Sequence, residues 1–140
     1  MDLAQALAFA RTRSEGVLTT IKRDGRPQLS NIMYSCEGDE ARISITASRA
    51  KTKNLMRDPR AALYVPGDDF WSYVVLDGTV VLSPVAQRPD DETVDQLVEL
   101  YRDLRGEEHP DWAEYRQAMV EDQRLVARLR PTSAYGSVRG

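Results

Sequence analysis

Apolar and polar residues alternate in short successive segments between residues 17 and 82, and this pattern most narrows the folds open to the chain. Residues 17–22 and 28–35 are rich in β-forming types and flank Asp24-Gly25, a dipeptide typical of hairpin turns. A second turn is predicted at residues 37–39, before alternation resumes in residues 42–47. We therefore expect three strands in an antiparallel meander.

Further strands are expected at three places. Residues 61–65 form a short apolar run, as in a buried strand, and residues 71–82 form a longer strand pattern. Asp77-Gly78 interrupts the longer pattern, which predicts a turn or a bulge that bends the strand. Alternation in residues 125–130 predicts a last strand that ends at Pro131.

Helices are expected at both ends of this β-rich region. Apolar residues recur at helical spacing after Asp2, which predicts a capped helix ending near Arg13. Acidic first turns and apolar stripes predict two more helices, one over residues 89–106 and one after Pro110. The order of elements indicates the α+β class, as a mostly antiparallel barrel with peripheral helices.

Length and charge restrict the classes of protein. With 140 residues, one domain over residues 1–140 is expected. The net charge of −3 disfavours a general nucleic-acid binder. Cys36 is the lone cysteine, so no intramolecular disulfide or multi-cysteine metal site is expected. We see no signal-peptide pattern and no membrane-length apolar run, and we therefore expect a cytoplasmic protein without a membrane partner.

A basic segment follows the strand at residues 42–47. Ser48 is expected to cap a short helix from Arg49 to about Arg57, and five cations against one acid lie in residues 49–60. Two of the chain's three lysines, Lys51 and Lys53, fall here, although the chain has sixteen arginines. A helix start with nearby hydroxyls and cations can bind a phosphate, and a solvated basic helix face is the alternative.

Acid–base and metal chemistry have few candidates. His109, the sole histidine, stands beside Pro110 and is expected to be solvated, so neither a catalytic triad nor a histidine metal site is expected. Trp71 and Tyr73 either contact a ligand or fill the core. An anion site with aromatic residues and few acid–base groups suits a cofactor that carries its own chemistry.

Several segments together resemble the split β-barrel flavin and deazaflavin oxidoreductases, relatives of pyridoxamine 5′-phosphate oxidase, and in particular the actinobacterial branch that uses coenzyme F420. The resemblance covers most of the chain. It rests on residues 16–21, 24–31, 48–55, 58–61, 71–73, 115–120 and 135–136. It implies a split β-barrel of the FMN-binding type and a homodimer with the cofactor in a groove between subunits.

The resemblance also implies roles for single residues. Arg49 and Lys51 would hold the cofactor phosphate. The other implied cofactor-binding residues are Ser44, Thr46 and Asn54 near the phosphate, Gln28, Ser30 and Asn31 along the ring and ribityl region, and Trp71 from the partner subunit.

The implied function is an F420H2-dependent oxidoreductase that transfers hydride to an electron-poor, unsaturated small molecule. The alternatives are an F420 or FMN binding or storage protein without turnover, and an FMN-dependent oxidase of the pyridoxamine phosphate type. The last is disfavoured because the chain ends in residues 135–140 without a histidine. FMN remains the alternative cofactor.

Overall fold

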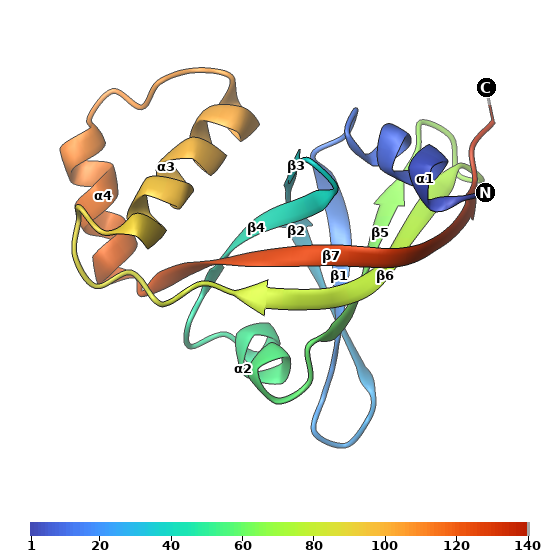
Figure 1. The fold of residues 1–140 in the computed structure, drawn as a ribbon, viewed down its shortest axis with the longest axis horizontal. Helices are drawn as coiled ribbons and strands as arrows, with labels where there is room; N and C mark the ends of the chain where they lie inside the picture. Colours follow the sequence, from blue (N-terminus) through green and yellow to red (C-terminus); the bar gives the residue numbers. More distant parts are fainter. Residues whose placement is uncertain (140) are drawn as a thin grey trace.

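Seven antiparallel strands form one curled sheet, and four helices surround it (Figure 1). The structure, a computed structural model, describes residues 1–139. The strands are β1 (Glu15–Ile21), β2 (Pro27–Met33), β3 (Ser35–Glu37), β4 (Glu40–Thr46), β5 (Arg60–Pro66), β6 (Tyr73–Leu82) and β7 (Arg124–Ser137). The helices are α1 (Leu3–Ala10), α2 (Ala50–Arg57), α3 (Glu92–Arg105) and α4 (Trp112–Glu121).

The strand order explains why the sheet curls. It runs β2-β1-β5-β6-β7-β4-β3, so β2 and β3 are the two edges although only Tyr34 separates them in the chain. This short connection requires the edges to approach each other, which curls the sheet into a split barrel. Tyr34 is fully buried, and its hydroxyl donates a hydrogen bond to the Ala10 carbonyl at 2.7 Å, which ties this connection to α1.

The predicted meander is only partly correct. The hairpin of β1 and β2 around Asp24-Gly25 is confirmed, with Thr20 opposite Gln28. However, β4 pairs with β3 and β7, and β2 pairs with β1 alone. The chain leaves β2 at Tyr34 and crosses to the other edge. The buried Tyr34 stands at this crossing, and its contacts with residues distant in the sequence cannot be seen in local sequence patterns.

The irregularity predicted at Asp77-Gly78 is confirmed as a β-bulge between β6 and β7, and it corrects the predicted end of the last strand. Gly78 pairs with Pro131 and Asp77 pairs with Ser133, so one residue of β7 is extra at this point. Proline has no N–H group to donate to the neighbouring strand, and at a bulge this donor is not required. The strand β7 therefore continues past Pro131 to Ser137. At Gly78 a Cβ atom would collide with the Arg130 carbonyl, so the two strands approach too closely there for a side chain.

Three helix starts follow the expected chemistry. Asp2 and Gln5 form a capping box on α1, with hydrogen bonds of 2.8 and 2.9 Å. Asp91 and Asp111 cap α3 and α4 through their carboxylates. The α3 helix ends at Gly106, whose φ of 68° is the left-handed conformation that glycine adopts readily.

The helices α3 and α4 pack on the outer face of β7, at a distance from α1 and α2 (Figure 1). They share a separate apolar cluster with Val126 of β7, which includes Val94, Leu97, Val98 and Met119. Within residues 1–139 no helix is long and apolar enough to cross a bilayer.

Candidate functional site

The junction between β4 and α2 is held by the carbonyl of Thr46. This oxygen accepts hydrogen bonds from the Arg49 N–H at 3.1 Å and from the Thr52 hydroxyl at 2.7 Å. Arg49 occupies the N-cap position without a side-chain cap, so the predicted capping by Ser48 is wrong. The helix therefore begins at Ala50, one residue later than predicted. In the described chain, the N–H groups of Ala50 and Lys51 have no acceptor, and they remain available to an anion.

Arg49, Lys51 and Arg124 form a cation cluster at this junction. Burial lowers the pKa of the Lys51 ammonium, and the charges of Arg49 and Arg124 lower it further. Within residues 1–139 neither Arg49 nor Lys51 has a carboxylate oxygen within 4.0 Å, and the nearest carboxylate to Arg124, on Asp122, lies 3.9 Å away. The three positive charges are therefore largely uncompensated, and an anion bound here would relieve their repulsion.

Arg124 was missed by sequence reasoning. It begins β7 and pairs with Thr46 at the end of β4, and its Nη1 atom lies 3.4 Å from the Ser44 hydroxyl. The Nε atom of Arg124 is buried and has no hydrogen-bond partner in the described chain. The only available signal was a cation at the start of the predicted last strand. Its relevance depends on the β4–β7 register, which no local pattern provides.

A pocket of about 420 Å³ adjoins the cation cluster. Ser44, Arg105 and Arg124 form its polar side, and apolar residues of α3 and α4 form most of its apolar side. Met33 of β2 and the rings of Tyr101 and Tyr115 also line it. The arrangement offers an anion-binding end next to aromatic surface, as an amphiphilic anion requires.

Gln28 and Asn54 contact each other instead of standing free. The Asn54 amide donates hydrogen bonds to the Gln28 side-chain oxygen at 2.8 Å and to the Thr20 hydroxyl at 3.2 Å. Its own oxygen accepts one from Arg57 at 2.9 Å. These contacts fix α2 against β1 and β2, so both residues position the helix that carries Lys51.

The remaining residues of β2 point to different sides. Gln28 and Ser30 share the half-buried face of the strand, and Asn31 lies on the exposed face with Leu29 and Met33. The Ser30 hydroxyl is buried without a partner in the described chain. One ligand surface within a single subunit therefore does not contact all three predicted residues.

Trp71 lies far from the cation cluster along the barrel. It belongs to the turn between β5 and β6, whose Asp68 pairs with Arg13 just before β1, whereas Arg57 of α2 bonds to Ile21 at the other end of β1. Trp71 is 61% exposed and packs edge-to-face on Phe70, which is 83% exposed. Neither ring fills the core. Tyr73, by contrast, is half-buried and stacks on Tyr64.

His109 is not the solvated residue that was expected. It is half-buried, and its ring packs against Tyr101, Trp112 and Tyr115. Its Nδ1 atom accepts a hydrogen bond from the Asp111 N–H at 2.9 Å. This places it in a structural role between α3 and α4. No group of three metal-ligating side chains occurs in residues 1–139.

Solved structures with the same fold belong to proteins of different described functions. An F420 reductase is 24% identical, covering 89% of this chain and 92% of that chain, with a TM-score of 0.61. A conserved hypothetical protein from Mycobacterium tuberculosis is 21% identical over 100% of this chain and 93% of that one, with a TM-score of 0.73. A heme storage protein from Vibrio cholerae is 16% identical, covering 97% and 95%, with a TM-score of 0.67.

These TM-scores show a shared split β-barrel fold, and the sequence itself matches a family. The profile of the family described as pyridoxamine 5′-phosphate oxidase matches residues 3–137, almost the whole chain. The chain therefore belongs to the pyridoxamine 5′-phosphate oxidase family.

Proposed function

We propose that this protein binds coenzyme F420 and acts as an F420H2-dependent oxidoreductase. The observation that carries the proposal is the uncompensated cation cluster of Arg49, Lys51 and Arg124 beside a partly aromatic pocket. The phosphate of a deazaflavin or flavin cofactor matches this donor set in charge and in hydrogen-bonding capacity. An F420 reductase with the same fold supports the choice of cofactor.

In this proposal the residues of the chain bind and orient the cofactor. Arg49, Lys51 and Arg124 hold the phosphate, and the free N–H groups of Ala50 and Lys51 donate to it. When bound and reduced, the deazaflavin supplies a hydride to an electron-poor, unsaturated acceptor. No carboxylate pairs closely with the cluster in the described chain, so its cations are available to the phosphate. A phosphate held in this way would fix the position of the cofactor ring relative to the acceptor.

The proposal includes a homodimer with the cofactor groove between subunits. Trp71 stands at the opposite end of β1 from α2, so a Trp71 side chain near the cofactor would come from the partner subunit. The exposed face of edge strand β2, with Leu29 at 63% and Met33 at 48% exposure, supports an interface on this side of the barrel. Analytical ultracentrifugation tests the dimer.

The second candidate is a binding or storage protein without turnover, and FMN is the alternative ligand for the same anchor. Two related folds are described as heme-binding or heme storage proteins, so heme is a further ligand to test. In this chain His109 is held by Asp111 and by three aromatic rings, which does not favour it as an axial heme ligand.

The test combines binding with single turnover. Fluorescence titrations with F420, FMN and hemin rank the ligands, and F420 is expected to bind most tightly. Protein loaded with F420H2 is then mixed with quinones, enones and tetrapyrroles while the absorbance of the reduced cofactor is followed. Loss of absorbance with an acceptor supports the oxidoreductase. Tight F420 binding without oxidation across the panel favours the storage protein, and tighter FMN or hemin binding rejects F420 as the cofactor.

A further inference from the structure

A second groove, of about 620 Å³, lies on the opposite side of Val126 from the cation cluster. On β7 the residues Arg124, Val126 and Arg128 alternate with core residues and therefore share one face. Val126 is buried under α3, Arg124 lines the smaller pocket and Arg128 lines this groove. The groove is thus a separate feature from the candidate cofactor site.

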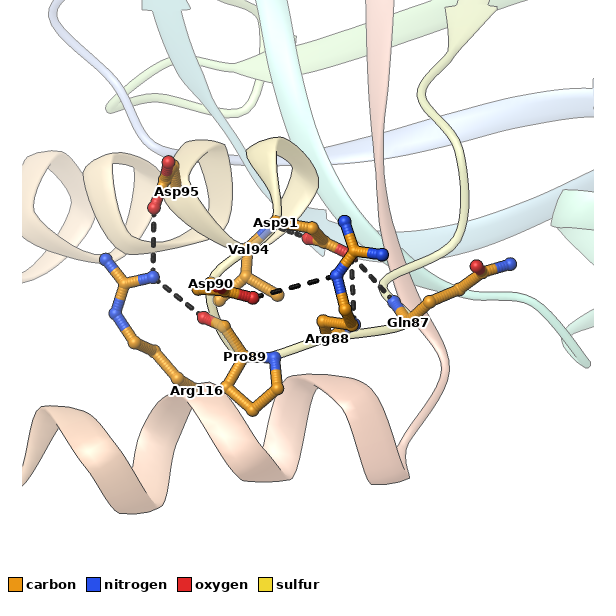
Figure 2. A network of polar contacts seen from close by, with 8 residues as sticks. All are labelled: Gln87, Arg88, Pro89, Asp90, Asp91, Val94, Asp95 and Arg116. Carbon is orange, nitrogen blue, oxygen red and sulfur yellow. Dashed lines mark hydrogen bonds and ion pairs between the residues drawn. The ribbon is translucent and has the colours of Figure 1, made fainter.

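One wall of the groove is an irregular loop, residues 83–91, that polar contacts hold in place (Figure 2). One carboxylate oxygen of Asp91 accepts from the N–H groups of Gln87 and Arg88 at 2.8 and 3.1 Å, and the other accepts from Val94 at 2.9 Å. Burial of Asp91 favours its neutral form, but these donors outweigh it and hold the pKa below the usual value.

Arg116 and Thr93 also anchor this loop. Arg116 of α4 reaches across to the Pro89 carbonyl and the Asp95 carboxylate, each at 2.9 Å (Figure 2). The buried hydroxyl of Thr93 donates to the Pro84 carbonyl at 2.9 Å. The wall is therefore organised before any ligand binds, which lowers the entropic cost of binding.

Two polar groups in the groove lack partners. Arg128 is half-buried, and within residues 1–139 no carboxylate lies within 4.0 Å of its guanidinium and no hydrogen bond engages it. The side-chain oxygen of Gln96 is buried, and in the same part of the chain no donor reaches it. Buried polar atoms are normally satisfied, so the Gln96 oxygen points to a ligand, and the half-buried guanidinium of Arg128 in the same groove is available to an anion.

The other charges of the groove leave Arg128 as its available cation. Arg130 pairs with Glu40 at 2.7 Å, and Arg88 stands 3.7 Å from Asp90. The Asp91 carboxylate is used by the loop, and Glu92 is exposed. Val81, Leu82 and Val85 add apolar surface beside Arg128.

We propose that this groove binds a small organic carboxylate with a hydroxyl or amino group next to the carboxylate and an apolar tail. Arg128 pairs with the carboxylate, the Gln96 oxygen accepts from the hydroxyl or amino group, and the tail lies on Val81, Leu82 and Val85. The assignment does not depend on the proposed cofactor.

The experiment is a titration of the 140-residue chain followed by backbone amide NMR shifts, with four probes. 2-Hydroxyhexanoate has all three features, hexanoate lacks the hydroxyl, 1-hexanol lacks the charge and inorganic phosphate lacks the tail. We expect saturable shifts in residues 83–96 and 128 with 2-hydroxyhexanoate, weaker binding of hexanoate, and no saturation with the last two probes.

Two variants and one control locate the site. Arg128→Gln is expected to weaken 2-hydroxyhexanoate binding roughly tenfold or more, and Gln96→Leu to remove its advantage over hexanoate. Arg124→Gln, on the same face of β7 but at the other pocket, should leave the affinity unchanged. No saturable shift, equal binding of 1-hexanol, or a loss with Arg124→Gln instead of Arg128→Gln would overturn the proposal. If Arg128→Gln does not fold, Gln96→Leu alone decides.

Discussion

The guanidinium of Arg124 lies 3.4 Å from the hydroxyl of Ser44, although 80 residues separate them in the chain. The pairing of β4 with β7 brings a cation from the end of the chain to the cluster at the start of α2. In the proposed phosphate anchor, Arg124 therefore has the same role as Arg49 and Lys51.

From this relationship we predict that Arg124→Ala weakens F420 binding by roughly 1.5–3 kcal/mol, the range for hydrogen bonds to charged groups. Isothermal titration calorimetry measures the change. The control is Arg128→Ala, on the same face of β7 but outside the cluster. An affinity loss of the same size in both variants would mean a general charge effect instead of a local anchor.

The lowered pKa of Lys51 predicts a pH dependence of cofactor binding. A bound phosphate favours the charged ammonium and raises this pKa again, so affinity is full below the pKa of the free protein. Affinity should fall as pH rises through that value, starting below the usual lysine pKa of about 10.4. Titrations between pH 7 and pH 10 test this, and Lys51→Ala should flatten the profile. A wild-type profile as flat as that of the variant contradicts the assignment.

Tyr34 is predicted to hold the connection between the two sheet edges. Tyr34→Phe removes one of the two donors to the buried Ala10 carbonyl and leaves the Arg13 N–H at 3.1 Å, so it should lower the free energy of unfolding by about 0.5–1.5 kcal/mol. Urea unfolding measures the loss, and Tyr135→Phe, at an exposed position, is the control.

The same tyrosine should contribute to alkaline unfolding. Burial raises the pKa of Tyr34, so its contribution to stability is complete below the usual tyrosine pKa of about 10 and is lost as pH rises from there through the raised value. Tyr34→Phe removes this contribution. Between pH 8 and pH 11, the free energy of unfolding measured with urea should therefore decrease less in the variant than in the wild type. An equal decrease in both proteins would contradict a role of Tyr34 in alkaline unfolding.

Arg42 links the barrel to α3. Its side chain is only 3% exposed and pairs with Glu37 at 2.8 Å and with Asp103 of α3, both of which are about half exposed. Because water can solvate the freed carboxylates, Arg42→Ala should cost about 1–3 kcal/mol of unfolding free energy, less than a fully buried pair.

A matched substitution separates charge from packing at this position. Arg42→Met keeps an apolar stem and should cost less than Arg42→Ala. Arg88→Ala, in an exposed pair, should cost under about 0.5 kcal/mol. Urea denaturation of the three variants measures the loss of unfolding free energy in each. An equal loss for Arg42→Ala and Arg42→Met would mean that the ion pairs, and not the packing of the side-chain stem, account for the contribution of Arg42.

Local features of the fold could be predicted from the sequence. The Asp24-Gly25 hairpin, the irregularity at Asp77-Gly78 and the cap at Asp2 depend on neighbouring residues alone. The pairing of β4 with β7 instead of β2, and the continuation of β7 past Pro131, depend on contacts between distant segments. No periodicity in the sequence reports such contacts.

The same distinction applies to the candidate site. Arg49 and Lys51 could be identified because they stand together where a strand pattern meets a basic helix. Arg124 could not, because it stands alone between Gln123 and Leu125 and its place in the cluster is set by the register with Thr46. The part-buried hydrogen bond between Gln28 and Asn54 could not be predicted either, since neither residue stands out in its own segment.

The central claim is that the cluster of Arg49, Lys51 and Arg124 anchors a cofactor phosphate, and a comparison of two ligands tests it most directly. The dissociation constants of F420 and of its phosphate-free deazaflavin fragment are measured for the wild type, Lys51→Ala and the exposed control Lys53→Ala. We predict that Lys51→Ala weakens F420 roughly 10- to 150-fold and barely changes the fragment, with Lys53→Ala near wild type. Equal losses for both ligands, or no loss for F420, would contradict the phosphate anchor.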